Sequence, residues 1–196
     1  MKKFSPFMIF HLVLMSALFL SACFSMVMFI GGFKLAVEGR GMAEVLMNGL
    51  LLLVVIAMFA VGILYSLNEY GKKSAIYYKT FLLLLLAITI LAIFLDTLFV
   101  AELHPLLTVK AVLYVVKALV LIGLVFWKDL GKTKTFALAF SLMALDIISV
   151  ALWIVYLLGT SFNFSIIGGI AALVADITVL LAVKGKYKDK EERGSK

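Results

Sequence analysis

Three ionisable side chains, Lys117, Asp146 and Asp176, lie inside long runs of apolar residues. The run around Asp146 reads LMALDIISVAL, and the runs LYVVKALVLIG and VADITVLLAV hold the other two. An ionised group in apolar surroundings costs free energy unless it is paired, so we expect the three side chains to meet. Ser149 shares the helical face of Asp146 and is expected to offer a hydroxyl to the same centre.

The formal charges of this centre do not balance, because one lysine faces two aspartates. We therefore expect Lys117 to pair with one aspartate, and a proton to be held by the other or shared between them. Such a centre can bind and release a proton or a cation, or it can be a fixed clamp in helix packing or assembly. A transport role predicts that replacing Asp146 or Asp176 by asparagine abolishes activity without loss of the protein.

An enzyme is the remote alternative. Two aspartates on neighbouring helices could form an intramembrane aspartyl dyad. However, ALDII and VADIT lack the Gly-x-Gly-Asp pattern of intramembrane aspartyl proteases, and Lys117 at the same level would disturb a shared proton. The chain has no glycine-rich phosphate loop, and its single cysteine and two histidines form no metal-ligand motif. We expect no catalysis, no metal and no cofactor.

Two further groups of residues are candidates for function. An outer polar group flanks the junction between two apolar runs and consists of Asp96, Glu102, His104 and Lys110. This group is either a solvated hairpin at the membrane surface with an Asp–Lys pair, or a vestibule above the deeper centre. The first apolar run carries small residues at helical spacing, Ala17, Ser21 and Ser25. This helix-docking face either packs inside the bundle or contacts a partner.

The elements that position these residues are predicted from composition. The 196-residue chain is 65% hydrophobic and 15% charged, with a mean hydropathy of +1.18, whereas soluble domains are about 25% charged. Six segments approach the length of about 20 residues that crosses a bilayer. The sequence thus predicts an all-α membrane protein, a bundle of six transmembrane helices with short loops. The predicted spans are residues 7–33, 45–68, 80–101, 106–127, 136–158 and 164–183.

The positive charges indicate an orientation. Lysines cluster at residues 2–3, 72–79, 128–134 and in the basic tail 184–196, which we expect to be disordered. The positive-inside rule then places both termini in the cytoplasm, in a bacterial-type inner membrane. The net charge of +7 therefore reflects the membrane surface, and we expect no nucleic-acid partner.

The stretch LSAC, which ends at Cys23, fits a lipoprotein cleavage box, but ten more apolar or small residues follow it. We therefore expect an intact first helix. In size, number of spans and orientation the chain resembles the small six-helix substrate-binding subunits of vitamin transporters, a resemblance of architecture without a specific motif.

We expect a membrane-embedded subunit of a larger membrane complex or of a translocation system. The alternative is a self-contained small transporter or substrate-binding subunit that uses the buried carboxylates for proton or cation coupling. The expected partners are the lipid bilayer, a second protein chain or copy, and a small solute, proton or cation.

Overall fold

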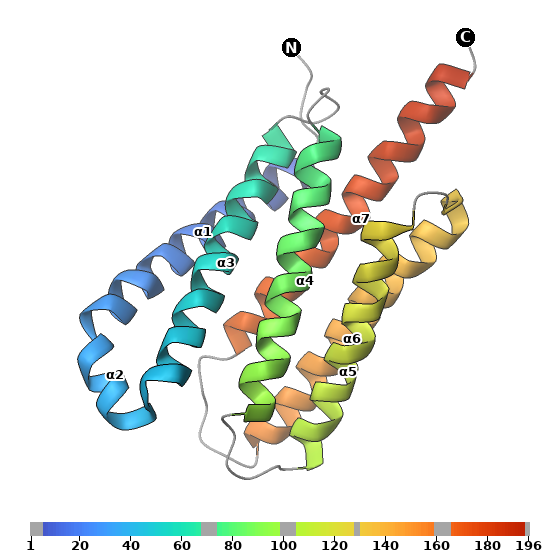
Figure 1. The fold of residues 1–196 in the computed structure, drawn as a ribbon. Helices are drawn as coiled ribbons and strands as arrows, with labels where there is room; N and C mark the ends of the chain where they lie inside the picture. Colours follow the sequence, from blue (N-terminus) through green and yellow to red (C-terminus); the bar gives the residue numbers. More distant parts are fainter. Residues whose placement is uncertain (1–5, 68–73, 99–104, 128–129, 159–165, 195–196) are drawn as a thin grey trace.

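The computed structural model describes residues 6–67, 74–98, 105–127, 130–158 and 166–194, and nearly all of these are helical (Figure 1). The helices in this part of the chain are α1 (Pro6–Gly31), α2 (Phe33–Arg40), α3 (Met42–Leu67), α4 (Ser74–Leu98), α5 (Pro105–Phe126), α6 (Lys132–Leu158) and α7 (Ile166–Gly194). Both prolines of the chain stand at the first residue of a helix, where the missing N–H group costs no hydrogen bond.

The short helix α2 turns the chain between the two long helices α1 and α3. It ends at Arg40 and is capped by Gly41, whose φ of +88° lies in the region that glycine adopts without strain. The N–H of Gly41 donates to the carbonyl of Val37 at 3.0 Å, which satisfies one of the last carbonyls of α2. The predicted connection between the first two spans therefore contains an ordered helix.

Helices that follow one another along the chain pack side by side, in the order α1, α3, α4, α5, α6 and α7. Helix α7 also contacts α1, α3 and α4, and Figure 1 shows it passing behind α4. A side chain on α7 can therefore reach either the α5–α6 side of the bundle or the α1–α3 side. Helix α7 therefore joins the α5–α6 side of the bundle to the α1–α3 side.

Among the described residues, five helices contain segments long and apolar enough to cross a membrane. These segments are Ile9–Gly31, Met42–Leu67, Ala75–Leu95, Thr108–Phe126 and Lys132–Leu152. Only 11% to 28% of each segment is buried, and large side chains such as Phe24, Leu119 and Ile148 are exposed. An apolar outer surface of this kind matches lipid rather than water.

Figure 1 shows that α1 begins and α7 ends at the same end of the bundle. The sixth span and the cytoplasmic side of both termini stay predictions. The structure differs from the prediction in the tail, since α7 continues to Gly194 where disorder was expected from residue 184. Lysine, glutamate and arginine have high helix propensity, and a helix already formed upstream extends without a new nucleus.

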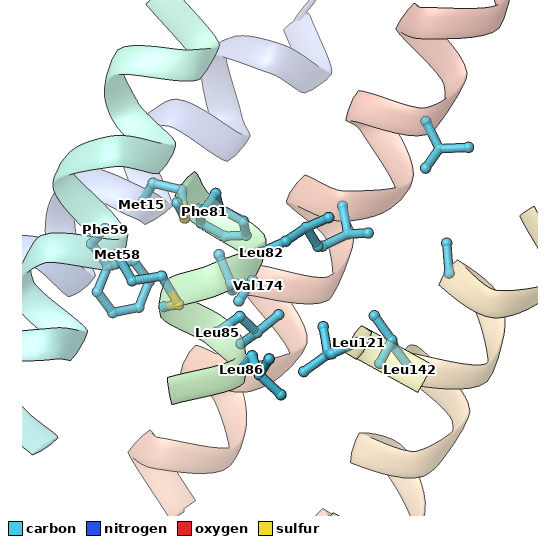
Figure 2. Packing of buried hydrophobic residues seen from close by; sticks show 14 residues of the cluster. Met15, Met58, Phe59, Phe81, Leu82, Leu85, Leu86, Leu121, Leu142 and Val174 are labelled. Carbon is cyan, nitrogen blue, oxygen red and sulfur yellow. The ribbon is translucent and has the colours of Figure 1, made fainter. Parts of the chain in front are cut away.

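A cluster of buried hydrophobic residues joins α1, α3, α4, α5, α6 and α7 (Figure 2). Its members are Met15, Met58, Phe59, Phe81, Leu82, Leu85, Leu86, Leu121, Ala139, Leu142, Val174, Ala175, Val179 and Val183. Leu121 lies one turn after Lys117, and Leu142 lies one turn before Asp146. Val174 and Ala175 directly precede Asp176. Close packing at this level therefore fixes the helices that carry the three predicted charges.

Candidate functional site

Lys117 of α5 and Asp146 of α6 form a buried ion pair. The Lys117 Nζ donates a hydrogen bond to Asp146 Oδ2. Only 5% of the lysine side chain and 2% of the aspartate side chain are exposed. A hydrogen-bonded pair at this depth offsets part of the cost of removing two charges from water.

Asp176 of α7 completes the group, but it is held differently. Its Oδ1 lies 4.0 Å from the Lys117 Nζ, which is an ion-pair distance and too long for a hydrogen bond. The residue is fully buried, and neither carboxylate oxygen has a hydrogen-bond partner in the described part of the chain. The structure thus brings the three predicted side chains together, with the lysine nearer to Asp146.

Ser149 lies one turn after Asp146 on α6, but its hydroxyl does not bond to the charged centre as predicted. It is 5% exposed, and its hydroxyl has no hydrogen-bond partner among the described residues. A buried serine in a helix usually bonds to the carbonyl four residues earlier or to a neighbour. The Ser149 hydroxyl is therefore free to bind a group outside its own helix.

A cavity of 360 Å³ opens beside the ion pair, between α3, α4, α5, α6 and α7. Lys117, Asp146 and Ser149 line it, whereas Asp176 does not. The rest of the lining is largely apolar and includes Met58, Phe59, Leu85, Ile88, Val150 and Ala172. A largely apolar chamber of a few hundred cubic ångströms with a few polar groups is the usual form of a small-molecule site.

Lys110 of the predicted outer group also lines this cavity. It lies two helical turns from Lys117 on α5, and its ammonium is 5.2 Å from the centre of the Tyr114 ring, a cation–π distance. The cavity therefore extends from the ion pair toward the end of α5 that was predicted to face outward. Glu102, His104 and the side chain of Asp96 lie outside the described residues, so the predicted Asp–Lys pair stays a prediction.

The helix-docking face of α1 is exposed at all three positions, Ala17, Ser21 and Ser25. The Ser25 hydroxyl donates to the Ser21 carbonyl at 2.9 Å and so is satisfied within its own helix. Packing of this face inside the bundle, one of the two predicted alternatives, is therefore wrong for the described part of the chain. The small residues point outward instead.

Sequence reasoning missed a second buried polar contact, between α1 and α7. The His11 Nε2 lies 2.9 Å from Thr178 Oγ1, and the two residues are 4% and 2% exposed. The sequence signal for this contact is a lone histidine in an apolar run. Thr178 follows Asp176 by two positions and so lies on nearly the opposite side of α7. Polar contacts thus hold α7 from two sides.

We expect Thr178→Val to lower the stability of the protein by about 1–3 kcal/mol, because it leaves the buried His11 ring without its partner. The matched control is Thr89→Val. Thr89 is also buried, and its hydroxyl donates to the Leu85 carbonyl of its own helix at 2.8 Å, as the Thr178 hydroxyl donates to the Val174 carbonyl at 3.1 Å. The two threonines therefore differ in the contact with His11. Thermal unfolding of both variants in detergent tests this difference, and equal melting temperatures would contradict it.

Fold and site together define a class, an all-helical chain whose apolar helices suit a multi-pass membrane protein and whose charged centre is buried between them. No known protein family matches the chain, and no curated protein or solved structure is significantly similar to it. Its function must therefore be inferred from the site.

Proposed function

We propose that this protein is a membrane-embedded binding component of a solute translocation system. It resides in a bacterial-type inner membrane with both termini in the cytoplasm, an orientation supported by the lysines at the ends of the apolar runs. A small solute occupies the cavity beside the polar centre. The Lys117–Asp146 pair and the Ser149 hydroxyl bind the polar part of the solute, and the apolar walls bind the rest.

The observation that carries this proposal is the cavity itself. A clamp that only fixes helix packing gains from close contact around the ion pair, because empty volume forfeits dispersion energy. Here the pair borders 360 Å³ of open space, and the adjacent serine hydroxyl has no partner among the described residues. Both features favour a site for an additional molecule.

A second candidate is a structural subunit of a larger membrane complex. The observation that favours it is the closed ion pair, since the Lys117 ammonium is already bonded to Asp146. In that case the charges select the helix arrangement, and another chain completes the function.

We expect native mass spectrometry of the protein, tagged at its C-terminus and gently extracted from its own membrane, to detect a retained small molecule. Ala172→Phe should abolish its retention, because Ala172 lines the cavity and a phenyl ring there fills much of the volume. Ala151→Phe is the matched control, because Ala151 is exposed on α6 and lies outside the cavity lining.

Equal retention by both variants would place the molecule on the outer surface and contradict the cavity as the binding site. A mass that contains another chain and no small molecule would instead favour the structural subunit.

A further inference from the structure

The position of Asp176 raises a question of charge. The described buried residues that carry formal charge are Lys117, Asp146 and Asp176, which leave one negative charge without compensation. Removing one partner from a buried ion pair is strongly destabilising, because the remaining charge is uncompensated. Asp176 is only partly compensated here, since Lys117 lies 4.0 Å away and gives its hydrogen bond to Asp146. A cation must therefore accompany Asp176.

A proton fits this position better than a metal ion. A metal cation requires several oxygen ligands at short distances. The Asp176 carboxylate instead has an ammonium beside it, 4.0 Å from Oδ1, which repels a metal ion. Within the described residues, no group of three or more His, Cys, Asp or Glu side chains could hold a metal. A proton needs no additional ligands and no additional space.

The two aspartates differ in access. Asp146 and Lys117 line the cavity, whereas Asp176 is not among the lining residues. A proton or a solute that enters the cavity therefore reaches the ion pair before it reaches Asp176. Lysine carries its charge on a flexible four-carbon stem, so a small rotation moves the Lys117 ammonium from one carboxylate to the other.

We propose that Asp176 is a proton-binding site and that Lys117 exchanges between Asp146 and Asp176. When Asp146 takes up a proton from the cavity, its hydrogen bond with the Lys117 ammonium breaks. The ammonium then pairs with Asp176, whose carboxyl group releases its proton. One proton is bound and one is released, so the net charge of the centre is unchanged. Coupling of this exchange to a solute rests on the proposed function, whereas the proton site does not.

The charged and titratable groups around Asp176 are consistent with an exchange that involves Lys117 and the two aspartates. From α5 it faces Lys117 at 4.0 Å, and from α6 it interacts with Asp146. The titratable His11 of α1 contacts Thr178, on nearly the opposite side of α7. In the described residues, α3 and α4 contribute no buried charged side chain.

Infrared spectroscopy of the full-length protein in lipid at neutral pH tests the proposal. We expect the wild type to show the C=O stretching band of one neutral carboxylic acid, which shifts in D₂O. Asp176→Asn should remove this band. Asp146→Asn should remove it as well, because Lys117 then pairs with Asp176 and its carboxyl group ionises. Glu38→Gln is the control, since Glu38 is exposed and the band should not change.

A wild type without the band would overturn the proton site. A band that survives in Asp176→Asn would assign the proton to another residue and also overturn it. A band that survives in Asp146→Asn would overturn the exchange of Lys117. If Asp146→Asn does not accumulate, Lys117→Met is measured in its place. Without the ammonium, Asp146 should also become neutral, so the absorbance of neutral carboxylic acid should increase. Unchanged absorbance would contradict the proposal. Failure to find a solute by native mass spectrometry would not alter these bands, so it would count against the proposed function alone.

Discussion

Lys117→Met is expected to reduce stability by about 3–5 kcal/mol, the usual cost of removing one partner from a buried ion pair. The substitution keeps the length and apolar stem of the side chain but leaves two carboxyl groups without a cation in a low-dielectric interior. The cost falls on Asp146, which loses the cation to which it is hydrogen-bonded. Thermal unfolding in detergent measures the effect.

Lys79→Met is the matched control, because Lys79 is exposed on α4 and its replacement should change the melting temperature little. A double variant, Lys117→Met with Asp146→Leu, should recover part of the loss, since an apolar pair removes the unpaired charge. If Lys117→Met melts at the wild-type temperature, the three side chains do not form a common centre.

Much of the all-helical fold could be predicted from the sequence, because a long apolar segment in lipid must satisfy its own backbone hydrogen bonds, which a helix does. The meeting of Lys117, Asp146 and Asp176 could also be predicted, since separate charges facing lipid are costly. In the structure, α5, α6 and α7 pack so that the three residues meet.

Other features depend on packing, which sequence patterns do not encode. Nothing in the residue types indicates that Lys117 bonds to Asp146 rather than to Asp176. The cavity arises from side chains of five helices and could not be derived from any one of them. The contact of His11 with Thr178 requires α7 to lie against α1, a non-sequential neighbour.

The largest departure from additivity is expected when both aspartates are replaced. Asp176→Asn should cost about 1 kcal/mol or less, because the amide resembles a neutral carboxyl group in size and polarity. Asp146→Asn should cost little more, because Lys117 can turn to the carboxylate at 4.0 Å. In the double variant the lysine has neither partner, and the loss should reach about 3–5 kcal/mol.

The same thermal unfolding experiment on the two single variants and the double variant gives the coupling energy between the aspartates. Two carboxylates that act independently on the lysine would give single losses that add up to the double loss. A large excess in the double variant means that each aspartate substitutes for the other, which requires Lys117 to move. If the losses of unfolding free energy are additive, Lys117 pairs with Asp146 alone and Asp176 is a separate buried acid. The size of this excess therefore measures how freely the charge exchanges at the centre of the bundle.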